Sequence, residues 1–320
     1  MDILGIDIGK LKFDAWLMTA SGGRHISLPN TPAGFDQLVA WLDRHRDGDS
    51  TPLHACMEAT GNYGLDLASF LFARGEVVSI VNPRRIKAFG EAELSRNKTD
   101  KQDAGLIARF CRAQCPPPWA PPAAHLRELR ELTRRCGALK AMRTQEMNRL
   151  KSGFASTVLR GSIERTIVHL EEEIAMMSAE IRGLIAADAA LSKNYDLLTS
   201  IPGIGDVTAA LLLAELPNIA EFEPKGLAAF AGLSPAEHSS GQRQGPAGIS
   251  RIGNPVVRSA MYLCALSARR HNPMLAGFAQ RLKQNGKPNR VILVAVARKL
   301  LVLAHAVIRT QTEFAVANGL

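Results

Sequence analysis

Four acidic residues in the first third of the chain have the types and spacing of a divalent-cation site: Asp7, Glu58, Asp100 and Asp103. Asp7 lies in GIDIGK and Glu58 in MEATGNYG, each at the end of an apolar, strand-like run. Asp100 and Asp103 lie in NKTDKQDA, three residues apart, and so share one face of a helix. Carboxylate oxygens suit Mg²⁺ or Mn²⁺, and two such ions can activate the attacking group and stabilise the leaving oxygen of a phosphodiester. The spacing therefore predicts metal-dependent phosphoryl transfer.

Each carboxylate also has a structural interpretation. Asp7 could close a hairpin, Glu58 could cap the following helix, and Asp100 could be a first-turn acid favoured by the helix dipole. Asp14 is the most credible substitute among the neighbouring acids. The joint arrangement, with two strand ends facing one helix, favours the metal site.

A serine-containing loop near the C-terminus is the second candidate site. It reads AGLSPAEHSSGQRQGPAGISRIGNP and carries the run Ser239, Ser240, Gly241 among three arginines, Arg243, Arg251 and Arg258. A serine hydroxyl is a weak nucleophile unless its proton is removed and its target is polarised. Arginine side chains can polarise a phosphate because each offers a planar fork of donors. The alternative is a flexible turn that only touches phosphate.

The run IPGIG, residues 201–205, resembles the glycine-rich turn of a helix-hairpin-helix element. Backbone N–H groups near Gly203 and Gly205, at the start of the next helix, could hold a DNA phosphate. Similar turns also join helices without binding a ligand.

The positive charge is concentrated in the C-terminal part. The net charge is +9, and twelve of the 39 Lys and Arg residues lie between Glu237 and Glu313, where no Asp or Glu occurs. The rest of the chain is slightly acidic. A segment of this kind attracts polyphosphate and predicts nucleic-acid binding, with solubility or an acidic protein partner as alternatives.

The elements that position these residues form three predicted domains, 1–118, 119–195 and 196–320. In the first, strands alternate with helices, which indicates an α/β fold, and the prolines from Pro116 to Pro122 mark its end. The expected strands are 3–8, 11–17, 24–28, 53–57 and 77–81, and the expected helices are 35–45, 65–73 and 99–115.

The second domain is expected to be an all-helical arm. Apolar residues recur every three or four positions from His125 to about Leu191, with a turn at Gly153–Ser162. This pattern predicts a coiled-coil oligomerisation arm or a plain bundle core. The third domain, mainly helical, should hold the IPGIG turn, a helix at 207–216, the serine loop and two C-terminal helices.

Several features predict a cytoplasmic protein without a membrane span. No export signal precedes the first strand, and the apolar run 291–308 is interrupted by Arg298 and Lys299, which favours a buried helix. The five cysteines are an odd number without metal-ligand spacing, as expected for reduced thiols.

At GIDIGK, EATG, RNKTDKQDA, IPGIG and GLSPAEHSSG with ISRIGNPVVR, the chain resembles the DEDD transposases of insertion sequences, the bridge-RNA-guided recombinases. The resemblance covers nearly the whole length. It implies a RuvC-like, ribonuclease-H-type domain with metal ligands Asp7, Glu58, Asp100 and Asp103, a coiled-coil arm, and a transposase domain with a catalytic serine. That serine maps to Ser240, with Ser239 as the alternative because the serine is doubled.

The resemblance implies a recombinase of a prokaryotic cytosol or nucleoid that cuts and rejoins donor and target DNA. It also implies a structured noncoding guide RNA and a homo-oligomer, dimer or tetramer. One alternative is a RuvC-like junction nuclease without covalent serine chemistry. Another is an actin-like or sugar-kinase-like ATPase, since GIDIGK also resembles the first phosphate loop of that superfamily, although the later half lacks a convincing second Gly-rich phosphate loop.

Overall fold

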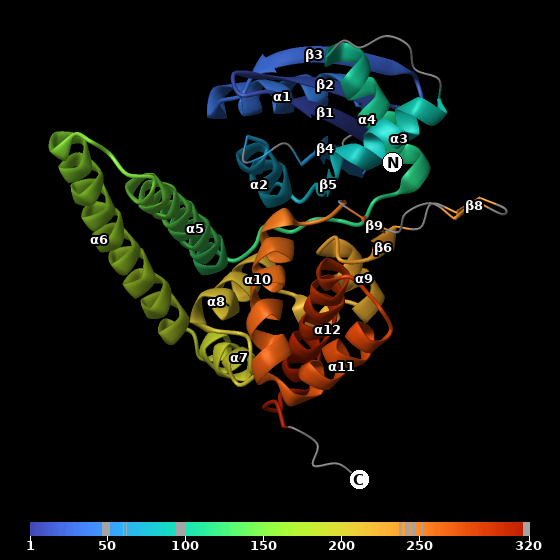
Figure 1. Cartoon of the computed structure of the whole chain (residues 1–320). Helices are drawn as coiled ribbons and strands as arrows, with labels where there is room; N and C mark the ends of the chain where they lie inside the picture. Colours follow the sequence, from blue (N-terminus) through green and yellow to red (C-terminus); the bar gives the residue numbers. More distant parts are fainter. Residues whose placement is uncertain are drawn as a thin grey trace. The chain divides into compact units, whose positions relative to one another are not determined.

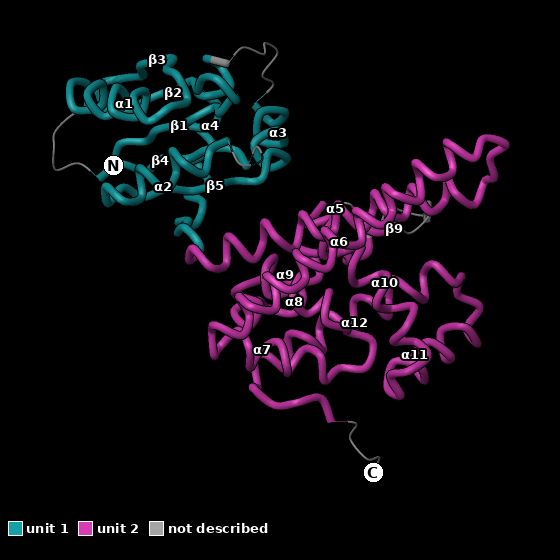
Figure 2. Tube along the Cα trace, turned by 90° about the vertical axis from the view of Figure 1, so that its left-hand side faces the viewer, with its two compact units in different colours: residues 1–122 teal, residues 123–320 magenta. Residues whose placement is uncertain are grey.

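The computed structural model describes residues 1–46, 52–59, 61, 63–93, 100–236, 239–240, 243–244, 248–250 and 252–315. The chain divides into two compact units, residues 1–122 and 123–320 (Figure 2). The first unit is α/β and the second is mainly helical, so the predicted mixed α/β class, mostly helical, is confirmed. The finer division at residues 118 and 195 stays a prediction.

Unit 1 is built on a sheet of strand order β3-β2-β1-β4-β5 (Figure 1). The strands are β1 (Asp2–Ile8), β2 (Lys12–Met18), β3 (Gly23–Pro29), β4 (Leu53–Glu58) and β5 (Val77–Val81). The first three strands form an antiparallel meander, while β4 pairs in parallel with both β1 and β5. All five strands were predicted from their apolar runs.

Helices cover both faces of this sheet. Leu4, Ile6 and Ile8 pack against α1 (Pro32–His45) and α2 (Leu65–Ala73), whereas Ile3 and Cys56 face α3 (Pro83–Ala92) and α4 (Asp100–Gln114). The sequence did not predict α3, because only Ile86 and Gly90 of this helix are buried. Alternate strand residues therefore serve two separate cores.

Unit 2 begins with a helical hairpin of α5 (Ala124–Lys151) and α6 (Thr157–Ala187), which pack against each other (Figure 1). The turn between them is shorter than the predicted 153–162, because Ser156 caps α6 by accepting a hydrogen bond from the backbone N–H of Leu159. Asp188 caps the next helix in the same way, which ends the long helical run early.

The rest of unit 2 is a helical core. Its elements are α7 (Ala189–Thr199), α8 (Asp206–Glu215), a 3₁₀ turn η1 (Ile219–Glu221), α9 (Pro224–Phe230), α10 (Pro255–His271), α11 (Pro273–Gln284) and α12 (Asn289–Thr310). Three C-terminal helices replace the two expected, because Asn272 caps a new helix whose first residue is Pro273.

In the described part of the chain, one helix, α12, is long and apolar enough to cross a membrane. Its residues Ile292, Val296, Leu300 and Ala304 are buried in the core of unit 2, where α12 packs against α10 and α11. The prediction of a buried helix for 291–308 is therefore confirmed.

Candidate functional site

Asp7 and Glu58 lie side by side at the carboxyl ends of two parallel strands. The pairing of β1 with β4 places Ile6 opposite Met57, so Asp7 and Glu58 are the next residues along each strand. Side chains alternate between the faces of a sheet, and both carboxylates therefore belong to the face that α4 covers. Each is partly exposed.

The helix α4 brings Asp103 to the same edge. A Cβ at Gly5 would lie 2.2 Å from the carbonyl oxygen of Ala104, so the helix backbone rests directly on β1. Further along α4, Ile107 packs with Ile3, at the opposite end of the strand from Asp7. The helix thus runs against β1, and its first turn lies at the end where Asp7 is found. We call Asp7, Glu58 and Asp103 the carboxylate edge.

Asp14 lies directly opposite Asp7 across the β1–β2 pair and is buried. Its carboxylate is held by His25 Nε2 at 2.8 Å and by Lys12 Nζ at 3.2 Å. These contacts assign Asp14 to partners on its own hairpin, which weakens it as a substitute ligand.

The fourth predicted ligand, Asp100, is the first residue of α4, and its side chain lies outside the described residues. Among the side chains that are described, no group of three or more His, Cys, Asp or Glu is arranged to hold a metal ion. The backbone places Asp7, Glu58 and Asp103 at the same edge of the sheet, but their described side chains do not form a ligand set there. Their oxygens are donors suited to a hard divalent cation, and metal binding by these residues stays a prediction.

A pair of buried thiols, one on β4 and one on α4, lies between these two elements. The hydrogen bond between Cys56 and Cys111 lowers the pKa of Cys111 to about 6 against the opposing effect of burial, with His54 also favouring the thiolate. The same hydrogen bond and burial raise the pKa of Cys56. All five cysteines of the chain are free. The pair links β4, which carries Glu58, to α4, which carries Asp103.

The serine loop contains two short ribbons where the sequence predicted only a loop. β6 (Pro235–Ala236) pairs with β9 (Gly248–Ile249), and β7 (Ser239–Ser240) pairs with β8 (Arg243–Gln244). Ser240 pairs with Arg243 in the antiparallel register. The side chains of Ser239, Ser240 and Arg243, and the whole of Arg251, lie outside the described residues.

Two glycines hold the base of this loop together. Gly253 has φ +141°, and a Cβ there would lie 2.4 Å from the carbonyl oxygen of Phe230. Gly232 has φ +66°, and its Cβ would lie 2.9 Å from the carbonyl oxygen of Ser250. The two chain segments that enter and leave the loop therefore touch backbone to backbone, which only glycine permits. We call residues 230–235, 249–250 and 252–254 the loop base.

Arg258, on α10, supports the loop base from below. Its Nη1 lies 2.4 Å from where a Cβ of Gly232 would be, and this atom is buried without a hydrogen-bond partner in the described structure. Part of the guanidinium thus packs against Gly232 of the loop base. The contact of Arg258 with a nucleic-acid phosphate stays a prediction.

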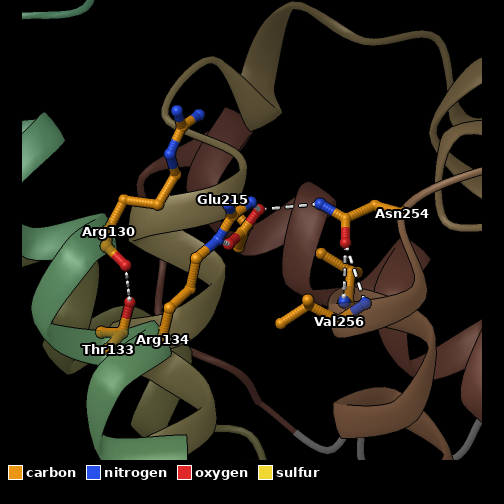
Figure 3. Close-up of polar contacts among 7 residues, drawn as sticks. Arg130, Thr133, Arg134, Glu215, Asn254 and Val256 are labelled. Atoms are coloured by element: carbon orange, nitrogen blue, oxygen red, sulfur yellow. Dashed lines mark hydrogen bonds and ion pairs between the residues drawn. The ribbon is translucent and has the colours of Figure 1, made fainter. Parts of the chain in front are cut away.

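An ion pair between a buried Glu215 carboxylate and a half-exposed Arg134, which the sequence did not single out, lies beside the loop base (Figure 3). Arg134 of α5 donates two hydrogen bonds to the Glu215 carboxylate, Nε to Oε1 at 2.6 Å and Nη2 to Oε2 at 2.9 Å, and Asn254 Nδ2 donates a third at 2.8 Å. The available signals were an acid at the end of the apolar run LLLAE and an Asn before Pro255. Neither signal names its partner.

The IPGIG segment is a turn between α7 and α8, as predicted. Gly203 has φ +108°, and a Cβ there would lie 2.5 Å from Ala268 Cβ, so this glycine is needed for packing against α10. Gly205 is the N-cap of α8 and has open space around it. A surface hollow of about 440 Å³ is lined by both glycines together with Leu263 and Ser267. Phosphate binding at this turn stays a prediction.

Two family models match the chain. The first, described as a transposase and named DEDD_Tnp_IS110, matches residues 4–158, which include the carboxylate edge. The second, described as the transposase IS116/IS110/IS902 family, matches residues 195–280, which include the IPGIG turn and the serine loop.

Curated relatives extend over nearly the whole length. A pilin gene-inverting protein of Moraxella lacunata is 35% identical over 97% of this chain and 97% of its own. The pilin gene-inverting protein of Moraxella bovis is 34% identical over the same shares. An uncharacterised protein of insertion element IS110 from Streptomyces coelicolor is 30% identical over 48% of this chain and 39% of its own.

Proposed function

The chain belongs to the IS116/IS110/IS902 family of transposases, and from this membership we propose that it exchanges DNA strands with a carboxylate site in unit 1 and a serine nucleophile in unit 2. It is a DNA recombinase of the transposase type, and DNA is its substrate. The observation that carries the proposal is the coverage: family models span residues 4–158 and 195–280, and a relative aligns over 97% of each chain.

Unit 1 would supply the metal site. Membership in a DEDD-type family supports dependence on a divalent cation, and the ligands we propose on a RuvC-like, ribonuclease-H-type fold are Asp7, Glu58, Asp100 and Asp103. When bound, Mg²⁺ or Mn²⁺ would polarise a phosphodiester and stabilise negative charge on a leaving oxygen. The parallel register of β1 and β4 and the direct contact of α4 with Gly5 place Asp7, Glu58 and Asp103 at one edge of the sheet, which supports this assignment.

Unit 2 would supply the nucleophile, Ser240. Its Oγ attacks the phosphorus, a serine–phosphate ester forms, and the bond from phosphorus to one sugar oxygen breaks. The serine proton passes to a general base, and the departing sugar oxygen takes up a proton. One ester replaces another, so the broken bond's energy is kept for joining to a new strand. The arginines of the acid-free C-terminal segment are suited to neutralise the phosphate during this step.

The same proposal includes an RNA partner and an oligomer. The basic C-terminal segment has the charge to bind both DNA and a structured guide RNA, and the helical hairpin of α5 and α6 could join protomers as a coiled coil in a dimer or tetramer. A DNA-bound enzyme of this kind would act in the prokaryotic cytosol or nucleoid.

A strand-exchange reaction with labelled DNA and the cognate RNA tests the chemistry. We expect a protein–DNA adduct on a denaturing gel that is lost in Ser240→Ala and kept in the matched variant Ser239→Ala. Hydrolysed ends without an adduct would instead support a junction nuclease. If Ser239→Ala alone loses the adduct, the nucleophile is the neighbouring serine.

The pilin gene-inverting relatives favour a second outcome of the same chemistry, inversion of a chromosomal segment. Sequencing of DNA junctions in cells that express the chain would separate the two outcomes. Inverted segments flanked by fixed sites indicate an invertase, and new copies of an element at scattered sites indicate transposition.

A further inference from the structure

Glu215 is a buried carboxylate in the core of unit 2. It ends α8 after the apolar run 209–214, and its side chain is 2% exposed. Burial alone would raise its pKa, but hydrogen bonds from Arg134 and Asn254 outweigh burial and lower the pKa of Glu215. The residue is therefore a buried anion held by two donors from distant parts of unit 2. An apolar residue would fill this place at lower cost.

The two donors connect different parts of the unit. Arg134 belongs to the helical hairpin, at 81 positions from Glu215, and grips both carboxylate oxygens. Asn254 lies at 39 positions in the other direction, at the last residue of the loop base. One carboxylate thus ties the hairpin to the loop base through α8 (Figure 3).

Asn254 is fixed on every side. Its Oδ1 accepts hydrogen bonds from the backbone N–H groups of Val256 and Val257, which caps α10. Its own backbone N–H donates to the carbonyl oxygen of Phe230 at 2.6 Å, across the loop base. The remaining group, Nδ2, donates to Glu215. A shift of Glu215 would therefore move the point where the serine loop rejoins the core.

We propose that Glu215 is a positioning residue, which sets the serine loop through Asn254 and links the placement of this loop to the helical hairpin through Arg134. The proposal rests on the function proposed for Ser240. Pro235 and Ile249 of the loop base pair with each other in the ribbon β6–β9, and Ser240 lies further along the same loop in β7. A displacement at the loop base would therefore shift the segment that carries the nucleophile. A change in the position of the helical hairpin, for instance when it binds another molecule, would reach the loop through Arg134 and Glu215.

A side-chain swap separates positioning from helix capping. Asn254→Asp keeps an oxygen acceptor, and Asp is as good an N-cap as Asn, but the donor to Glu215 is lost and a second carboxylate faces it. Glu215→Gln added to Asn254→Asp restores a hydrogen bond between these two positions with donor and acceptor exchanged, but it removes the acceptor of Arg134 Nη2, which shares Oε2 with Asn254. The single variant should slow adduct formation on the order of 10²-fold, as a misplacement of about 1 Å can do. The double variant should recover part of the rate, because the link between positions 215 and 254 is restored while one contact with Arg134 is lost.

The rate constant is measured at saturating DNA in the full chain with its RNA, beside the DNA concentration for half-saturation and the melting temperature. Val296→Ala, which opens a cavity on the buried face of α12, serves as the control for lost stability. For each variant, the loss of rate constant is compared with the fall in melting temperature. A positioning role requires that Asn254→Asp lose far more rate than Val296→Ala for the same fall in melting temperature. The DNA concentration for half-saturation should stay unchanged.

Three results would overturn the inference: a normal rate in Asn254→Asp, an equal loss in the stability control, or no recovery in the double variant. A wild-type enzyme that exchanges strands without any adduct would contradict the serine chemistry instead. The same variants are then compared by their rate of strand exchange, and an unaltered rate in Asn254→Asp would overturn the positioning role as well.

Discussion

The carboxylate edge and the loop base hold their functional residues by different means. At the carboxylate edge, a continuous ladder of β1, β2 and β4 and a close-packed helix place Asp7 and Glu58. At the loop base, two glycine contacts and the hydrogen bonds to the buried Glu215 carboxylate hold the chain segments together. The first arrangement tolerates changes at single supports, whereas the second depends on a few residues. We therefore expect the largest losses of cleavage in unit 1 from mutations of the carboxylates themselves. In unit 2, mutations of the loop-base contacts should also slow the reaction.

The largest effect is expected for the carboxylate edge itself. Asp7→Asn, Glu58→Gln and Asp103→Asn should each lower strand cleavage on the order of 10³-fold, the size of effect seen when a group that stabilises transition-state charge is removed. Affinity for DNA should change little, because it depends on the basic surface. Quantitative cleavage and filter-binding assays test both parts.

The matched control is Asp14→Asn, the cross-strand neighbour of Asp7 whose own partners are His25 and Lys12. It should keep most of the cleavage activity. Equal losses in Asp14→Asn and Asp7→Asn would remove the distinction drawn between the two acids.

At the loop base, Gly253→Ala should destabilise unit 2 and slow adduct formation. The new Cβ meets the Phe230 carbonyl at 2.4 Å, and the left-handed backbone at φ +141° is strained for alanine, at a cost of about 1–3 kcal/mol. Gly277→Ala, in a helix with open space around it, should be neutral or slightly stabilising. Chemical denaturation measures the free energy of unfolding of both variants. Similar values for Gly253→Ala and Gly277→Ala would contradict the backbone contact at Gly253.

Salt dependence compares the two units as binding surfaces. Replacing Arg251 and Arg258 together by Gln should lower the slope of log affinity against log salt by about two units, one for each lost phosphate contact. The exposed pair Arg44 and Arg74 of unit 1, changed in the same way, should leave the slope unaltered. A reduced slope in the unit 1 pair would move the binding surface to the α/β unit.

The smallest effect concerns pH. Because the pKa of Glu215 is lower in the folded protein, its ionised form stabilises folding above the ordinary glutamate pKa of about 4.3, and that contribution is lost as the pH falls through the folded pKa. Glu215→Gln should thus have a flatter pH dependence of the unfolding free energy, and Arg134→Gln should flatten it similarly. An unchanged acid limb in both variants would contradict the ion pair.

The difference between the two regions also explains what the sequence could predict. The strands of unit 1 were predicted because Ile3, Ile6 and Met57 lie in apolar runs, and Asp7 and Glu58 follow from where those runs end. Helix α3 was missed because it buries so little that its apolar period is weak. The break before α11 was missed although Asn272 and Pro273 carry a clear helix-start signal.

The loop base could not be predicted in the same way. Gly232 and Gly253 are ordinary loop residues in the sequence, and their contact exists only after the chain folds. Glu215 finds partners 81 and 39 positions away, beyond the reach of any local pattern. Local periodicity indicates which face is buried, but it contains no information about which distant donors will satisfy a buried carboxylate.

The central claim is that unit 2 supplies a serine nucleophile, and the most direct measurement is peptide mapping of the protein–DNA adduct by mass spectrometry. The reaction is stopped during strand exchange, and protease and nuclease digestion leaves a nucleotide on the attached residue. We predict that this nucleotide is found on Ser240. A nucleotide on any other residue, or strand exchange without a modified peptide, would contradict the claim.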